Sequence, residues 1–327
     1  MAIDTYFFFG IFECITQPVT IIGNLLTMIA FLKVPSLQTH TSNRLIFALS
    51  IADMISGLYQ LFYFGIPFAF GLPPPFGEIG CMMIGPLEYT YNAGNFLLVA
   101  ISIDRVLLVS MDYSNYLKMM TKPRVRGAIV TCFGISYAAF FFELSLWNYA
   151  KENNAIAAGI DFTKTCLRPP RRMKWFSIFL SVCFFALPLL LVGLLSILFV
   201  KGLLKRIGKT RRIGPSSTTT SESNQESPDE DGSQGTVKKR YMKSAVTLAA
   251  LVSAMCVSML PYLTYLLIVG ISGSFSSAMN FIMYLVLQLN PFLDPLFYAA
   301  TQKGIREFYG SKIRALFRTI GGVFQNP

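Results

Sequence analysis

Seven long apolar runs constrain this chain more than any other feature of its sequence. They lie near residues 7–32, 45–69, 82–109, 126–149, 175–200, 244–271 and 277–300. A helix needs about 20 mostly apolar residues to cross a bilayer, so each run is long enough to span a membrane. Most runs also hold a polar residue or a proline. We therefore expect an all-α membrane protein, a seven-transmembrane helix bundle.

The composition supports a membrane protein and excludes several other classes. Of the 327 residues, 53% are hydrophobic and only 14% are charged, against roughly 25% charged residues in soluble domains. A disordered chain, a collagen-like fibre and a soluble enzyme with a charged surface are therefore excluded. The first run has no basic leader and no small-residue cleavage site, so we interpret it as a retained helix rather than a signal peptide.

The positions of lysine and arginine predict the orientation. If the N-terminus is extracellular, the cytoplasmic segments are 33–44, 105–126, 201–243 and 303–327, and they hold 22 of the 28 Lys and Arg residues. This asymmetry satisfies the positive-inside rule. The net charge of +11 is therefore interpreted as membrane topology rather than nucleic-acid binding. We expect a multi-pass plasma-membrane protein with an extracellular N-terminus and a cytoplasmic C-terminus.

The longest polar connection, 201–243, is the expected third cytoplasmic loop. Its middle, 213–236, is rich in Ser, Thr, Asp and Glu and is predicted to be disordered. Two interpretations stay open for this middle part, a plain linker and a segment tuned by phosphorylation. The basic flanks are expected to extend helices five and six towards anionic lipid headgroups.

Polar residues inside the apolar runs are candidates for function, because charges in a membrane are costly. Those that stand out are Asn24, Asp53, Glu88, Asp104, Arg105, Glu143, Asn290 and Asp294. None belongs to a nucleophile–base pair, a zinc-binding motif or a phosphate-binding loop. The single histidine and six scattered cysteines also lack metal-ligand spacing. The sequence therefore predicts a protein that is not an enzyme.

Together, these residues give the chain a resemblance to a known family. In order along the sequence, the matching motifs are Gly23–Asn24, Leu49–Asp53, Asp104–Val106, Pro188, Pro261–Tyr262, and Asn290 to Tyr298 with Asp294–Pro295 inside it. The chain resembles the rhodopsin-like, or class A, G-protein-coupled receptors over nearly its whole length. It is most similar to the amine receptors of the muscarinic and histamine type, although divergent. The resemblance implies a single receptor domain, 1–327, with a short amphipathic surface helix at 302–317.

The resemblance also implies roles for particular residues. The expected switch residues for G-protein coupling are Asp104, Arg105, Met259, Pro261, Pro295 and Tyr298. A disulfide between Cys81 and Cys166 is expected to pin the second outer loop, while the other four cysteines are expected to be free thiols. Asn24, Asp53 and Asp294 resemble the family's sodium and water pocket, so no cofactor is expected other than an allosteric sodium ion. A purely structural polar cluster is the alternative.

The expected ligand is a small extracellular molecule, because the N-terminal tail is only a few residues long. In amine receptors an aspartate stands seven residues after the helix-three cysteine and pairs with the ligand's cation. Here Glu88 holds that distance from Cys81. Tyr89, Asn92, Tyr262, Tyr265, Tyr284 and Gln288 complete the expected pocket.

The spacing between Cys81 and Arg105 weakens the interpretation of Glu88 as the acid that pairs with the ligand's cation. From Cys81 to Arg105 the chain is one residue short, so counting back from Arg105 puts Leu87 at the position of the amine-binding acid. One residue turns a helical side chain by about 100°. Glu88 is therefore either a counterion in the pocket or a carboxylate near the outer interface, paired with Arg168, Arg171 or Arg172.

Several departures from the family pattern bear on signalling. Met259 stands where a tryptophan is usual, Phe133 replaces the helix-four tryptophan, and Val106 and Ser196 replace tyrosines. The acid that commonly faces the helix-three arginine from helix six is also missing, so we predict raised ligand-free signalling. The expected partners are the ligand, a heterotrimeric G protein and membrane lipid, with kinases and arrestin at the third loop. The rival functions are a peptide or lipid receptor, a non-signalling decoy and, least favoured, a transporter.

Overall fold

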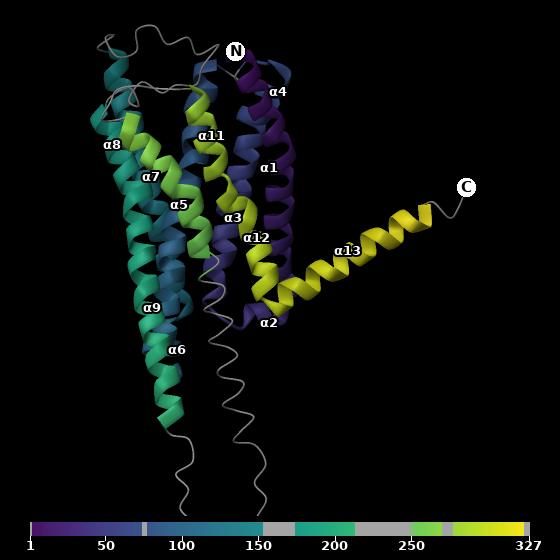
Figure 1. Ribbon diagram of the computed structural model, residues 1–327, viewed down its shortest axis with the longest axis vertical. Helices are drawn as coiled ribbons and strands as arrows, with labels where there is room; N and C mark the ends of the chain where they lie inside the picture. The colour runs from purple at the N-terminus through teal and green to yellow at the C-terminus, as the bar shows by residue number, and fades with distance from the viewer. Residues whose placement is uncertain are drawn as a thin grey trace, which may run out of the picture.

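The computed structural model describes residues 2–73, 77–152, 174–212, 249, 251–269 and 277–323, and all regular structure in these ranges is helical. The helices run side by side in an elongated bundle (Figure 1). Its long helices are α1 (Ala2–Lys33), α3 (Asn43–Gln60), α5 (Gly77–Ser110), α7 (Lys122–Glu152), α9 (Leu187–Arg212) and the helix over 251–269. Short helices α2 (Pro35–Gln38) and α6 (Tyr113–Met119) lie at the end of the bundle opposite the N-terminus.

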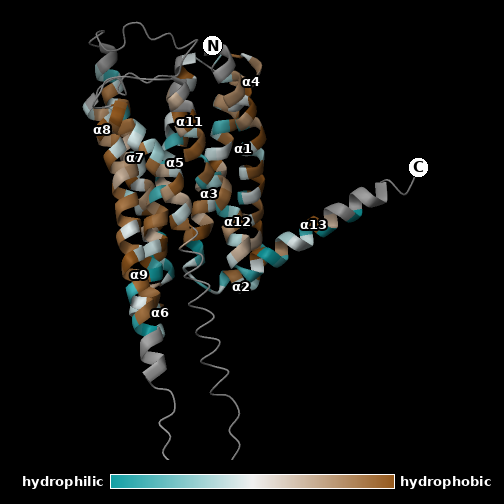
Figure 2. Cartoon of the chain, viewed as in Figure 1, coloured by the Kyte–Doolittle hydropathy of each residue, from teal (hydrophilic) through white to brown (hydrophobic). Residues whose placement is uncertain are grey.

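Six helices in the described part of the chain are long and apolar enough to cross a membrane. Helices α11 (Ser277–Leu287) and α12 (Leu289–Thr301) lie end to end and together cover the seventh predicted apolar run. Many large apolar side chains on the outside of the bundle are exposed, among them Ile15, Val130 and Leu190. Figure 2 shows that the helices of the bundle are mostly hydrophobic along their length, with hydrophilic residues frequent at α2, at α6 and at the start of α13. The predicted all-α membrane bundle is confirmed.

Prolines explain where the long helices change form. A proline lacks the N–H that would bond the carbonyl four residues earlier. The π-helical turn η1 (Leu61–Gly65) ends just before Pro67, at the start of α4 (Ile66–Phe70). The turn η3 (Val182–Ala186), which joins α8 (Lys174–Ser181) to α9, ends just before Pro188. Pro291 follows the break between α11 and α12 at Gln288.

Two asparagine side chains donate hydrogen bonds to backbone carbonyls that Pro188 and Pro295 leave without a helical partner. Pro188 frees the carbonyl of Phe184, which accepts a 3.0 Å hydrogen bond from Asn95 Nδ2 in α5. Pro295 frees the carbonyl of Pro291, which accepts a 3.1 Å bond from Asn24 Nδ2 in α1. These bonds tie α9 to α5 and α12 to α1 across the buried interior, where an unsatisfied carbonyl would be costly.

The core lies around α5, which packs against α3, α7 and α9, while α1 packs against α3 and α12. Leu49, Leu97, Met255 and Tyr298 have almost no exposed surface there. Gly23 allows α1 and α12 to approach closely, since a Cβ at this position would lie 3.0 Å from Cγ of Pro295.

Helix α13 (Lys303–Val323) leaves the bundle at a steep angle after α12 (Figure 1) and extends beyond the expected 302–317. Its first turns are amphipathic, with Ile305 buried and Arg306 and Glu307 exposed. Tyr309 donates a 2.7 Å hydrogen bond to the carbonyl of Gly23 and lies 2.6 Å from the hydroxyl of Thr27. The amphipathic helix is therefore bonded directly to α1.

Candidate functional site

Tyr284 lies close to other residues that were expected to line a ligand pocket. Its ring lies 6.1 Å from that of Tyr262, edge to face, and its hydroxyl accepts a hydrogen bond from Gln60 Nε2. The carboxylate of Glu88 is close enough to interact electrostatically with the same hydroxyl. The fold therefore brings together Glu88, Tyr262 and Tyr284 from three different helices.

Tyr89 lies on another face of α5 from its neighbour Glu88. It has no exposed surface, and its hydroxyl donates a 2.9 Å hydrogen bond to Oε2 of Glu143 in α7. Its ring also packs edge to face against Phe184 at 5.8 Å. Consecutive residues in a helix point about 100° apart. Glu88 therefore lies on the side of α11 and Tyr89 on the side of α7, so the structure does not place the acid–tyrosine pair as one unit.

The remaining expected pocket residues are largely buried. Asn92 lies one turn after Glu88, and Tyr265 lies one turn after Tyr262. Gln288 lies at the break between α11 and α12, and its Oε1 has no hydrogen-bond partner. The basic residues Arg168, Arg171 and Arg172, which are the alternative partners of Glu88, lie outside the described residues.

The carboxyl groups of Asp53 and Asp294 lie side by side in the middle of the bundle, with 3% and 0% of their surface exposed. Two carboxyl groups this close cannot both be ionised without a cation between them, so either a cation neutralises the pair or one of them holds a proton. Within the described part of the chain, no hydrogen bond of normal geometry reaches Asp53 Oδ2, either carboxyl oxygen of Asp294, or the amide oxygens of Asn24 and Asn290. These are the hard oxygen ligands that a sodium ion takes, so the donor set fits the expected ion.

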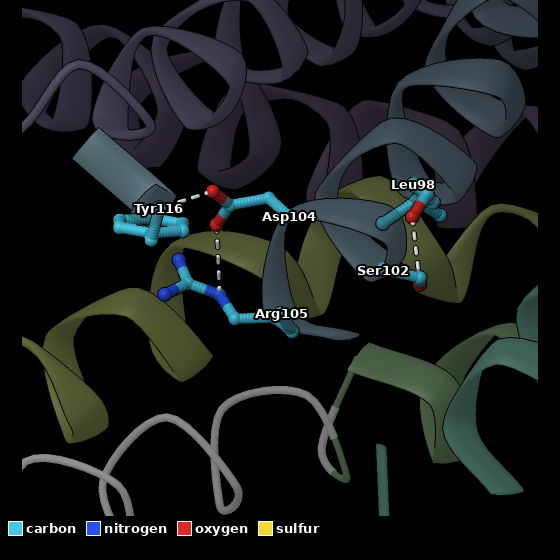
Figure 3. A network of polar contacts seen from close by, with 5 residues as sticks. All are labelled: Leu98, Ser102, Asp104, Arg105 and Tyr116. Carbon is cyan, nitrogen blue, oxygen red and sulfur yellow. Dashed lines mark hydrogen bonds and ion pairs between the residues drawn. The ribbon is translucent and has the colours of Figure 1, made fainter. Parts of the chain in front are cut away.

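Asp104 and Arg105 form an ion pair at the end of α5, with 3.5 Å between Oδ2 and Nε. The other oxygen of Asp104 accepts a 2.7 Å hydrogen bond from the hydroxyl of Tyr116 in α6 (Figure 3). Burial raises the pKa of Tyr116 well above its usual range, so this hydroxyl stays protonated and able to donate. The Asp104–Arg105 pair is therefore also stabilised by a hydrogen bond from α6. The sequence pattern did not identify Tyr116 as a candidate residue.

The other expected switch residues lie along the same interior. Met259 and Tyr298 are fully buried, Pro295 packs against Gly23, and Pro261 is half-buried in the helix over 251–269. Both partners of the expected disulfide lie outside the described residues, Cys166 entirely and Cys81 in its side chain. The segment 213–236, which was expected to be disordered, also lies outside them. The four other cysteines, Cys14, Cys132, Cys183 and Cys256, are free thiols as predicted.

One buried carboxylate, Glu13 in α1, was missed in the sequence. It has no exposed surface and accepts a hydrogen bond from Gln17 Nε2 one turn later. A glutamate and a glutamine four residues apart inside an apolar run share one helix face. This pattern is the sequence signal that could have identified Glu13 as a candidate residue. Glu13 also interacts electrostatically with the hydroxyl of Tyr284, so it belongs to the same region as Glu88.

Comparison with known proteins identifies the class. A family model described as 7 transmembrane receptor (rhodopsin family) matches residues 23–298. The chain therefore belongs to the rhodopsin family of G-protein-coupled receptors. It is a multi-pass membrane receptor and not an enzyme.

Its similar relatives include receptors named for amines. The histamine H2 receptor of Homo sapiens is 25% identical over 295 residues, which are 89% of this chain and 75% of that protein. The 5-hydroxytryptamine receptor 2B of Dichotomyctere fluviatilis is 28% identical over 58% of this chain and 40% of its own length. A muscarinic acetylcholine receptor of Drosophila melanogaster is 30% identical over 45% of this chain and 18% of its own length. The resemblance to divergent amine receptors is confirmed.

Proposed function

We propose that this receptor binds a small cationic ligand, with Glu88 as the counterion. The observation that carries this proposal is the convergence of Glu88, Tyr262 and Tyr284. A carboxylate beside aromatic rings suits an ammonium group, because the acid supplies the charge and the ring faces attract the cation. Histamine, 5-hydroxytryptamine and acetylcholine, for which these relatives are named, are all small amines or quaternary ammonium ions and support this chemistry.

Ligand binding is proposed to shift a two-state equilibrium that exposes a docking surface for a heterotrimeric G protein. Pro261 permits the helix over 251–269 to swing its inner end, since a proline interrupts the backbone bonding of a helix. Arg105, paired with Asp104 at the inner end of α5, is the proposed contact with the G protein. In this arrangement the receptor lies in the plasma membrane with an extracellular N-terminus.

We also propose raised signalling without ligand. The region before the helix over 251–269 carries Lys238, Lys239 and Arg240 rather than an acid that could hold Arg105. Signalling equal to that of cells without the receptor would contradict raised activity. Failure to activate any G protein despite surface expression would favour the non-signalling receptor. The third cytoplasmic loop is proposed as the site for kinases and arrestin, and α13 as a lipid-contacting helix.

Asp53, Asp294 and Asn24 are proposed to hold an allosteric sodium ion. Their partnerless oxygens support this assignment. The ion would neutralise the carboxylate pair, and Asn24 would link the pair to the Pro291 carbonyl in α12.

The proposed counterion is tested with Glu88→Gln, which removes the charge but keeps the shape. Cells that express the receptor with a promiscuous G-protein reporter would be screened against monoamines, peptides and lipids. We expect the response to the active amine to fall by at least about tenfold in Glu88→Gln, because a buried charge-assisted contact contributes more than about 1.4 kcal/mol. Glu307→Gln, on the exposed side of α13, is the matched control and should respond like the unmodified receptor.

The same screen tests the competing ligand classes. An amine response that survives Glu88→Gln unchanged contradicts the counterion role. A response to a peptide or lipid alone would instead favour recognition through the basic cluster 168–174.

A further inference from the structure

The buried polar cluster around Glu13 has more acceptors than donors. Oε2 of Glu13 is bonded to Gln17 Nε2, but Oε1 has no hydrogen-bond partner. The side-chain oxygens of Gln17 and Gln60 are also buried without a partner. The amide nitrogens of both glutamines are already engaged, one with Glu13 and the other with Tyr284. The cluster therefore presents three unpaired oxygens, one of them on a carboxyl group, and lacks a donor.

This cluster adjoins the proposed ligand pocket. Gln60 donates to the hydroxyl of Tyr284, and both Glu13 and Glu88 interact electrostatically with that same hydroxyl. Two carboxyl groups, one from α1 and one from α5, thus act on a single residue of α11. Tyr284 therefore links the residues of the proposed pocket to the cluster around Glu13, through its hydrogen bond with Gln60 and its contact with Phe9, one turn before Glu13.

Aromatic rings pack around Tyr284, beside the cluster that contains Glu13. The rings of Phe9 in α1 and Phe64 in η1 each lie 6.2 Å from the ring of Tyr284. Tyr59 packs edge to face on Phe64 at 5.5 Å. Core packing alone would suit such rings, but it would not explain buried oxygens that lack donors beside them. Rings next to a carboxyl group form a surface on which an ammonium group is stabilised.

We propose that Glu13 binds a second basic group of the ligand, so that the ligand is dibasic, with one positive group at Glu88 and the other among Glu13, Gln60 and Tyr284. This inference rests on the proposed function, since it extends the pocket that Glu88 defines. A protonated nitrogen supplies both the missing donors and the missing positive charge. Because Glu13 has no exposed surface, side chains packed over it must move before the second basic group can bind.

The test compares diamines with a matched monoamine on the purified full-length receptor. Putrescine and cadaverine are the dibasic probes, and n-butylamine is the monobasic one. Affinity is measured from the ligand-dependent rise in thermal stability, which needs no signalling partner. For the unmodified receptor we expect the diamines to bind at least about tenfold more tightly than n-butylamine. In Glu13→Gln this preference should disappear while the affinity for n-butylamine is kept.

Each outcome separates the two proposals. If n-butylamine binds and loses its affinity in Glu88→Gln, the proposed counterion stands, and equal affinity for diamines and monoamine then overturns only the role of Glu13. A diamine preference that survives in Glu13→Gln also overturns it. If neither n-butylamine nor the diamines bind, the role of Glu13 is overturned, while the counterion is judged by the monoamine screen with Glu88→Gln. Equal affinity for diamines and monoamine on the unmodified receptor would overturn the role of Glu13 even where Glu13→Gln does not fold.

Discussion

Asp104 illustrates how much one buried residue can depend on its surroundings. It has 1% of its surface exposed, pairs with Arg105 in its own helix, and accepts the hydroxyl of Tyr116 from α6. A buried carboxylate is stable only when its lone pairs are satisfied. Tyr116 therefore stabilises the charge that holds Arg105, and it connects the loop after α5 to the proposed switch.

Tyr116→Phe removes this hydroxyl and leaves a buried acceptor on Asp104 without its donor. We expect the free energy of unfolding to fall by about 1–3 kcal/mol, measured by thermal unfolding of the purified receptor. Tyr113→Phe is the matched control, because Tyr113 stacks on Tyr116 but is itself exposed, and its change should stay within about 0.5 kcal/mol. Equal stability of the two variants would contradict the role of Tyr116.

Asp53→Asn tests the proposed sodium site. We expect the unmodified receptor to be more stable in sodium chloride than in choline chloride of the same ionic strength, by about 1 kcal/mol when sodium is several times its Kd. The variant should lose this difference, because one of the two carboxylates that would bind the ion is gone. A sodium effect that persists in Asp53→Asn would show that the ion acts elsewhere, while Glu307→Gln should keep the full effect.

At the scale of helices, close contacts depend on small residues and on prolines. Gly10 in α1 faces the backbone of α4, where a Cβ would lie 2.6 Å from the carbonyl carbon of Phe68 and closer still to Ala69. The turn η1 leads into α4 just ahead of Pro67, and it sets the position of α4 against α1. The N-terminal half of α1, which includes Glu13, is therefore held by contact between two backbones.

Gly10→Ala is expected to destabilise the receptor by about 1–3 kcal/mol, because the added methyl group forces α1 and α4 apart. Gly134→Ala is the matched control. No atom lies within 4 Å of a Cβ there, so the change should be neutral or stabilise the helix by up to about 1 kcal/mol. Thermal unfolding of the two variants measures the difference, and a loss of stability in Gly134→Ala alone would refute the packing argument.

At the scale of the whole molecule, the distribution of charge predicts the orientation in the membrane. Epitope tags at the two ends test it directly in intact and permeabilised cells. We expect the N-terminal tag to be labelled on intact cells and the C-terminal tag only after permeabilisation, as an odd number of crossings and the positive-inside rule require. Labelling of both tags under the same condition would rule out seven crossings.

The order and approximate bounds of the helices follow from the sequence alone. A membrane crossing demands about 20 apolar residues, and a polar residue within such a run is conspicuous because it is costly to bury. For this reason Asp53, Glu88, Asp104 and Asp294 could be chosen as candidates without a structure. The prolines could be recognised in the same way, since each one must interrupt the bonding of its helix.

Only the tertiary structure decided which partner each side chain meets. Sequence spacing left the direction of Glu88 open, because a shift of one residue turns a side chain by about 100°. The packed helices place Glu88 near Tyr284 and turn Tyr89 towards Glu143. Likewise, Asp53 meets Asp294, and Asn24 reaches the Pro291 carbonyl 267 residues away. Such contacts depend on the rotation and depth of each helix against its neighbours, which local periodicity does not encode.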